Sequence, residues 1–221
     1  MMAMDYADIL HLISVIALPV LVAITLHEAA HGYVAWRRGD DTAYMLGRVT
    51  FNPLRHIDPI GTVLVPLILL FTAGVMFGWA KPVPVNFRRL VHPRRDMVWV
   101  ALAGPGINIA LAFVSALLVH LVGLLPPSAA VWVAENLRYS IVINLVLAVF
   151  NMIPLPPLDG GRVAVGLLPR RIAYPLSRVE PFGFLIIIVL LFMLPQLNLF
   201  EYVVGVPVQY LYNLILIVTG H

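Results

Sequence analysis

The sequence predicts an all-α, polytopic membrane protein, and three observations carry this prediction. Hydrophobic residues make up 61% of the 221-residue chain and charged residues only 11%, whereas a soluble domain carries about 25% charged residues. The mean hydropathy is +0.95. The apolar residues gather into five to six segments, several of them long enough to cross a bilayer. The chain has no cysteine, which excludes disulfides, thiolate zinc sites and cysteine nucleophiles.

Each apolar segment is expected to be a membrane helix or a membrane-inserted piece. In chain order the segments cover residues 9–37, 60–79, 97–125, 139–153, 182–195 and 197–218. The leader of the first segment carries acidic residues and no basic one, so we do not expect a cleaved signal peptide. The fourth segment is short and ends in a proline-dense string, through which a helix cannot run normally.

We interpret residues 1–221 as a single membrane-embedded domain, with a core at about 9–166 and C-terminal helices at about 182–218. Short extended β pieces near the membrane surface are expected at residues 42–51 and 83–87, because apolar and polar residues alternate there.

The second segment, residues 60–79, is interrupted by prolines and glycines and is expected to be re-entrant. If it enters and leaves on one side, every basic residue except Arg138 shares one face of the membrane. By the positive-inside rule that face is cytoplasmic. A full crossing would instead split the basic clusters and place residue 159 at the wrong end relative to His27.

The strongest chemical signal is the pentapeptide HEAAH, His27 to His31, near the end of an apolar run over residues 12–36. Residues four apart share one face of a helix, so both imidazoles can point at one metal ion. Glu28 lies beside that site, where its carboxylate can take a proton from water activated by the metal. Ionisable side chains inside a membrane-length segment are costly and therefore indicate a function. Metal-assisted hydrolysis within a bilayer is the leading hypothesis.

A catalytic zinc ion takes three protein ligands and keeps one position open, so a third ligand must come from elsewhere. The candidates are Asp159, His56, Asp58, His92, His120 and Glu180. Asp159 is the strongest, because it ends an apolar segment and is followed by two glycines that let the backbone approach closely. A turn residue or helix N-cap is the other interpretation of Asp159, and local sequence does not decide between the two.

These two motifs together resemble the site-2 protease family of intramembrane zinc metalloproteases. The HEAAH string is similar to the family's histidine–glutamate helix, and NMIPLPPLDG, from Asn151 to Gly160, is similar to its Asn-Pro-Asp-Gly segment. Residues 51–62, 79–86 and 103–108 are also similar to stretches of compact prokaryotic members. The resemblance covers residues from about 20 to 165. We identify no PDZ or CBS domain, although many relatives carry one.

The resemblance implies a role for each matched residue. His27, His31 and Asp159 would bind one zinc ion per chain, and Glu28 would be the catalytic base. Zinc would lie within the membrane toward the cytoplasmic side, in agreement with the charge pattern. The implied activity is endopeptidase cleavage in or near transmembrane segments, as in regulated intramembrane proteolysis. A short extended piece of the chain could pair with the unwound substrate by strand addition.

Three asparagines have a role that the resemblance or their position suggests. Asn151 would lie near the substrate or transition state, with Asn108 as a second polar residue close to the cleft. For Asn108 the alternative is an amide that bonds helix to helix, and this packing role is the favoured interpretation of Asn144.

The expected partners are the lipid bilayer of the cell membrane and a membrane-protein substrate with a transmembrane helix. No nucleic acid is expected, because the basic residues occur in short clusters between apolar segments.

The main alternative is a metal transporter or metal-sensing membrane protein. Its ionisable residues would be spread along a path, whereas here they concentrate at one depth. An inactive relative is disfavoured by the intact set of site residues. Another alternative is a membrane-anchored protease of the gluzincin type, which cleaves soluble substrates and takes its third zinc ligand from a downstream glutamate. The candidates are Glu135, Glu180 and Glu201, and the sequence around each of them is unfavourable for a metal ligand.

Overall fold

The structure is a computed structural model, and it describes residues 6–65, 67–68, 80–193 and 198–221. Within these ranges the chain is mainly helical and forms no β-strand. The helices are α1 (Tyr6–Arg37), α2 (Thr42–Met45), α4 (Pro93–Val119), α5 (Pro127–Asn151), α6 (Asp159–Leu167), α7 (Arg170–Ser177), α8 (Glu180–Met193) and α9 (Val206–Thr219). Shorter helical turns are η1 (Pro53–Arg55), η2 (Pro59–Leu64), η3 (Phe87–Arg89), η4 (Val122–Leu124) and η6 (Glu201–Gly205).

Among the described residues, four helical stretches are long and apolar enough to cross a membrane. They are Leu10–Arg37, Pro93–Val119, Pro127–Asn151 and Glu201–Thr219. The all-α, polytopic prediction is therefore confirmed. Helix α8 is apolar but has only 14 residues, fewer than the roughly 20 that a single crossing needs.

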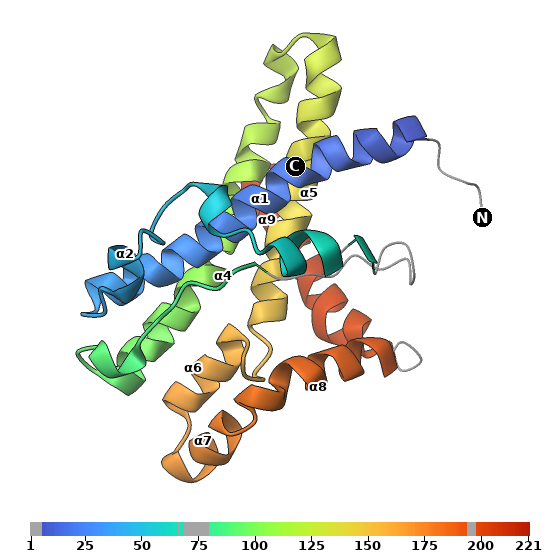
Figure 1. The fold of residues 1–221 in the computed structure, drawn as a ribbon. Coiled ribbons are helices and arrows are strands. Elements are labelled where there is room, and N and C mark those ends of the chain that lie inside the picture. The colour runs from blue at the N-terminus through green and yellow to red at the C-terminus, as the bar shows by residue number, and fades with distance from the viewer. Residues whose placement is uncertain (1–5, 66, 69–79, 194–197) are drawn as a thin grey trace.

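Helix α4 is the centre of the fold. It packs against α1, α5 and α6, and Figure 1 shows α4 and α5 as an antiparallel hairpin with α1 running across it. Alanines 112 and 116 of α4 meet Ile141 and Leu145 of α5 in a buried cluster. Small side chains let membrane helices approach closely and gain packing contacts. This tight hairpin is the platform on which α1 and α6 meet.

The predicted fourth segment, residues 139–153, is wrong at its start, because α5 begins at Pro127. Proline is well suited to the first position of a helix, where its missing N–H is not needed. The charged residues that interrupt the apolar pattern, Glu135 and Arg138, lie within the sequence of this helix. Glu135, for example, lies 2.7 Å from Nε2 of His11 on α1. A helix of 25 residues therefore replaces the short one that hydropathy indicates.

The predicted β pieces are also wrong. Thr42–Met45 forms the helical turn α2, because the Asp40 carboxylate accepts hydrogen bonds from the Thr42 backbone N–H and hydroxyl, and such local bonds favour turns. Residues 80–86 form no helix, but they pair with no strand in the described part of the chain. Pro82 and Pro84 lack the N–H groups that a ladder requires.

The predicted re-entrant course of residues 60–79 falls largely on residues 69–79, which lie outside the described ranges, and it stays a prediction. The described flanks of this segment meet, because the Lys81 N–H donates a hydrogen bond of 2.9 Å to the His56 carbonyl. A single crossing would separate the two ends by about 30 Å. The two described flanks therefore lie side by side.

Candidate metal centre

Three buried side chains from distant parts of the chain converge on one point. His27 and His31 come from α1, and Asp159 is the first residue of α6. The two histidine Nε2 atoms are 3.0 Å apart, and Oδ2 of Asp159 lies 3.2 Å from one and 3.3 Å from the other. The structure thus brings together the two histidines of the HEAAH motif and the strongest third-ligand candidate.

The second nitrogen of each imidazole is bonded elsewhere, which fixes the proton positions. Nδ1 of His31 lies 2.7 Å from the Val100 carbonyl, which can only accept, so Nδ1 carries the hydrogen. Nδ1 of His27 likewise donates to Oδ1 of Asn108 at 2.5 Å. Both Nε2 atoms therefore present lone pairs to Asp159, whose Oδ2 is buried without a hydrogen-bond partner. Three potential metal-ligating atoms therefore face one another.

This arrangement fits a zinc ion. Donor atoms about 2.0–2.1 Å from zinc at tetrahedral angles are separated by about 3.3 Å, close to the three separations given above. A divalent cation would also compensate the buried carboxylate, which is otherwise costly in an apolar surrounding. Two imidazoles and one carboxylate leave the fourth position for water or substrate, as in catalytic rather than structural sites.

The position of Asp159 depends on the two glycines that follow it. A Cβ atom on Gly160 would collide with the Met152 carbonyl, and one on Gly161 would collide with the backbone of Pro156. The start of α6 therefore lies directly against the proline-dense loop that follows α5. This confirms the predicted close backbone approach at Gly160 and Gly161, and it places the N-terminus of α6, where Asp159 is favoured, beside α1.

A stripe of α4 residues at four-residue spacing supports the two imidazoles. Val100 holds His31 through its carbonyl, and Asn108 holds His27 through its amide. Gly104, between them, has no side chain to fill the space in which both rings lie. A Cβ atom there would be 2.5 Å from Cε1 of His27 and from Nε2 of His31. Gly104 thus permits both imidazoles to reach the metal position.

Replacing Gly104 with alanine is expected to displace both rings. Overpacking of this kind costs about 1–3 kcal/mol, and zinc affinity should fall because the nitrogens leave their positions. Gly106→Ala is the matched control, since a Cβ atom on Gly106 has no other atom within 4 Å. Zinc titration of the purified variants measures the effect. Equal zinc affinity in both variants would contradict this account of Gly104.

The carboxylate of Glu28 is held by the backbone of the segment at residues 80–86. Its Oε2 accepts a hydrogen bond of 2.7 Å from the Val83 N–H. The segment itself is fixed by buried charges, because Arg48 donates to the Lys81 carbonyl at 2.8 Å and Asp40 accepts from the Asn86 N–H at 2.6 Å. Sequence reasoning did not find this support, since a backbone N–H leaves no signal in the residue pattern.

None of the other third-ligand candidates joins the group formed by the two histidines and Asp159. Local partners hold them instead: His56 by Thr50, Asp58 by Ile60 and Gly61, His92 by Asp96, His120 by Thr219, and Glu180 by Arg162. Burial also lowers the pKa of His56. These residues organise loops and helix ends.

The two predicted polar residues of the cleft differ in their surroundings. Asn108 has no exposed surface, and both its carbonyl and its amide nitrogen are hydrogen-bonded to protein groups. It therefore has no exposed group with which to contact a substrate, in contrast to the expected position at the cleft. Asn151 is half-buried at the end of α5, where its amide nitrogen donates to the Leu147 carbonyl of the preceding turn.

Comparison with known proteins identifies relatives that cover most of the chain. The sequence profile of peptidase family M50 matches residues 120–194. A Bacillus subtilis protein named "Putative zinc metalloprotease YwhC" is 41% identical over 185 residues, which cover 82% of this chain and 81% of that protein. "Putative zinc metalloprotease Rip2" of Mycobacterium tuberculosis strain H37Rv is 31% identical over 180 residues, which cover 80% of this chain and 66% of that protein. No solved structure matches the chain.

Proposed function

The chain belongs to peptidase family M50, the site-2 protease family of zinc metalloproteases, and from this premise we propose that it cuts membrane proteins within or next to their transmembrane segments. It is a zinc metalloendopeptidase and a multi-pass membrane protein. The observation that carries the proposal is the depth of the site. Both histidines lie inside the membrane-length stretch Leu10–Arg37, which supports a substrate that reaches them from the bilayer.

We assign one task to each residue of the site. Zinc held by His27, His31 and Asp159 supplies Lewis-acid polarisation of the peptide carbonyl and lowers the pKa of water toward neutrality. Glu28 takes the proton from the attacking water and passes it to the leaving amine. Asn151 has a second amide N–H besides the one bonded to Leu147, and this hydrogen is available to the carbonyl oxygen as negative charge develops on it.

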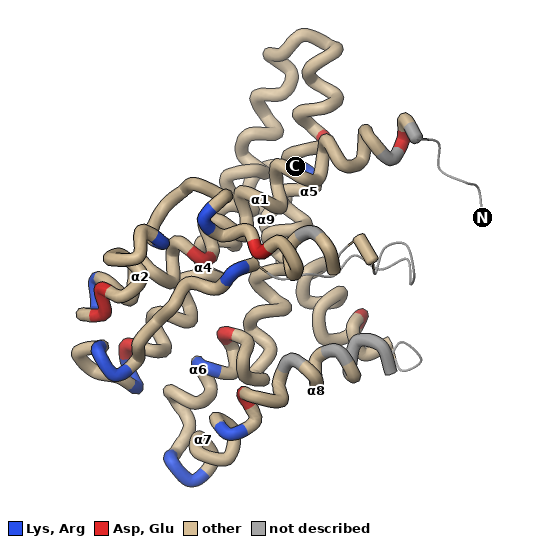
Figure 2. Tube along the Cα trace, viewed as in Figure 1, with Lys and Arg blue, Asp and Glu red and all other residues tan. Residues whose placement is uncertain are grey.

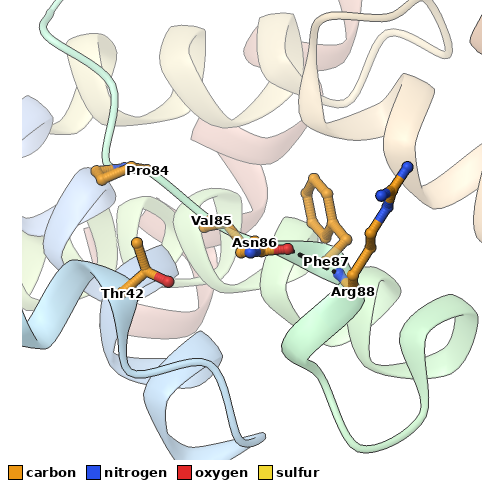
Figure 3. Close-up of a pocket in the computed structure, with 6 residues that line it drawn as sticks. All are labelled: Thr42, Pro84, Val85, Asn86, Phe87 and Arg88. Carbon is orange, nitrogen blue, oxygen red and sulfur yellow. Dashed lines mark hydrogen bonds between the residues drawn. The ribbon is translucent and has the colours of Figure 1, made fainter.

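The segment at residues 80–86 is the proposed binding edge for an unwound substrate. A helical substrate hides its carbonyls in intrahelical bonds, so it must unwind locally before cleavage. Figure 3 shows Pro84, Val85 and Asn86 following one another without helical turns along the border of a surface groove of about 460 Å³. Among the described residues, the N–H and carbonyl of Val85 and the carbonyl of Val83 have no hydrogen-bond partner. They are therefore available for strand addition.

Removing the backbone N–H of Val85 tests whether the segment at residues 80–86 binds the substrate. Val85→Pro is expected to raise KM by about 2- to 12-fold relative to Val85→Ala, because one hydrogen bond contributes about 0.5–1.5 kcal/mol net. The alanine variant keeps the N–H and loses the same packing against Leu90 and its neighbours, so it is the matched control. Steady-state kinetics on a membrane-spanning reporter give the comparison. Indistinguishable KM values would remove Val85 from substrate binding.

We propose that the catalytic site lies toward the cytoplasmic side and that residues 1–221 act as one membrane-embedded unit. Figure 2 shows the basic residues gathered around α2, the start of α4, and α6 and α7, whereas the tip of the α4–α5 hairpin has none. By the positive-inside rule, the basic end is cytoplasmic. The metal site is on that side, because Asp159 begins α6 and the two histidines lie in the last three turns of α1.

The decisive experiment is cleavage of a panel of single-span reporter proteins by the purified enzyme in lipid nanodiscs. Cleavage sites in or near the spans, lost on adding a chelator and restored by zinc, would support the proposal. Cleavage confined to soluble loops would contradict it. Metal flux into vesicles without any cleavage would instead favour the metal-transporter alternative.

A further inference from the structure

A chain of buried hydrogen bonds continues from the metal centre into the α4–α5 hairpin. The amide nitrogen of Asn108 donates a hydrogen bond of 2.7 Å to Oδ1 of Asn144 and a longer one, of 3.3 Å, to the Ala23 carbonyl of α1, which favours the same amide orientation. The amide nitrogen of Asn144 in turn donates to the Ser140 carbonyl at 2.9 Å. Asn108 is 0% exposed and Asn144 is 1% exposed. The mechanism described above uses none of these bonds beyond Asn108.

The direction of each bond in this chain is determined by its far end. The Ser140 carbonyl can only accept, so the Asn144 amide must turn its nitrogen toward Ser140 and its oxygen toward Asn108. The Asn108 amide then turns its nitrogen toward Asn144 and its oxygen toward His27. His27 must therefore carry its hydrogen on Nδ1, which leaves the Nε2 lone pair for the metal.

The opposite amide orientation would disable the ligand. With the nitrogen of Asn108 facing His27, the ring would have to accept at Nδ1 and carry its hydrogen on Nε2. A protonated Nε2 cannot bind zinc. Because no water competes for these groups inside an apolar bundle, the partners supplied by the protein decide which orientation forms.

We infer that Asn144 is a positioning residue of the metal centre, which sets the tautomer and ring orientation of His27 through Asn108. This rests on the proposed role of His27 as a zinc ligand. It replaces the interpretation of Asn144 as packing alone. Packing would need only an amide of the right size, whereas positioning needs an acceptor directed at Asn108.

Zinc affinity of the purified protein tests this inference without relying on activity. Asn144→Leu, which keeps the number and branching of the side-chain heavy atoms and removes the acceptor, is expected to weaken zinc binding by about 10- to 100-fold, as losing a residue that orients a metal ligand typically does. Asn144→Asp is expected to stay close to the wild type. A neutral carboxyl, which burial favours, still offers one acceptor and one donor.

Asn136→Leu is the matched control, because Asn136 is another buried asparagine of α5 and donates to the Trp132 carbonyl of its own helix. Zinc affinity is expected to be unchanged in this variant. A competing chelating dye gives the affinity, and the visible spectrum of the cobalt-substituted protein reports the ligand geometry. Thermal unfolding of the zinc-free proteins shows whether each variant is folded.

A double substitution separates positioning from packing. In an Asn108→Ala background, Asn144→Leu is expected to cause no further loss of zinc affinity, because its effect passes through Asn108. Additive losses, or an Asn144→Leu variant that binds zinc as tightly as the wild type, would overturn the inference. Failure of the wild type to bind zinc would instead contradict the proposed function, so the two failures are distinguishable.

Discussion

Replacing Glu28 with glutamine is expected to lower the rate of peptide hydrolysis by about 100- to 10,000-fold, the usual contribution of a positioned general base. Glutamine keeps the size of the side chain and an oxygen that can accept the bond from the Val83 N–H. The segment at residues 80–86 should therefore stay in place. The variant loses only the ability to take a proton from water.

The same variant should bind zinc as the wild type does, because Glu28 is not among the three converging ligands. Zinc content by elemental analysis and reporter cleavage in nanodiscs measure the two properties together. Glu180→Gln is the control, since that half-exposed carboxylate pairs with Arg162 outside the metal centre. Wild-type turnover by Glu28→Gln would remove Glu28 from the mechanism.

Replacing Asp159 with alanine is expected to have the second large effect, the loss of zinc and of cleavage together. Affinity should fall by more than about 100-fold, because residues that merely orient a ligand already contribute 10- to 100-fold. Zinc should stabilise the wild type against thermal unfolding, because it binds the folded state, and it should not stabilise the variant.

The effect of zinc on each variant separates a metal ligand from a structural residue. Asp41→Ala serves as the control, because Asp41 pairs with Arg89 at a surface site. Zinc titration and thermal unfolding of both variants, each with and without zinc, give the comparison. A zinc-free Asp159→Ala protein that unfolds well below the zinc-free wild type, with zinc affinity unchanged, would assign Asp159 to structure alone.

The membrane helices could be predicted because hydropathy and helix periodicity are local properties. The limits of α1 follow from an apolar run that ends in basic residues. The start of α5 could not be predicted in the same way. Its first four turns include Glu135 and Arg138, and the partner that accommodates Glu135 is His11, which lies 124 positions earlier in the sequence.

The extended pieces were predicted incorrectly because alternation alone does not specify a strand. Thr42–Met45 forms the helical turn α2, in which the apolar Ala43 is buried. A buried apolar residue among polar ones is thus compatible with a helical turn as well as with a strand. At residues 83–87, Pro84 has no N–H to donate to a ladder, and the backbone pairs with no strand in the described part of the chain. Side chains such as Glu28 hold it instead. These tertiary contacts override a weak local preference.

In the candidate site, the motif spacing indicated the two histidines. The glycines after Asp159 made it the strongest candidate for the third ligand, and the family resemblance favoured that role over a turn or N-cap. The roles of the supporting residues could not be predicted, because they depend on how α4 packs against α1. The resemblance suggested Asn108 as a residue of the cleft but not its bond to His27, and the sequence did not indicate the contacts of Gly104 and Val100 with the histidines. The orientation of Asn108 depends further on Asn144, which belongs to a third helix.

The central claim is that the three residues share one zinc ion, and X-ray absorption at the zinc edge tests it most directly. The protein loaded with one equivalent of zinc should show two imidazole nitrogens and two oxygen ligands at about 2.0–2.1 Å. Asp159→Ala should lose one of the oxygen ligands or fail to retain zinc. A shell of six oxygens, or a wild-type spectrum unchanged by Asp159→Ala, would contradict the claim.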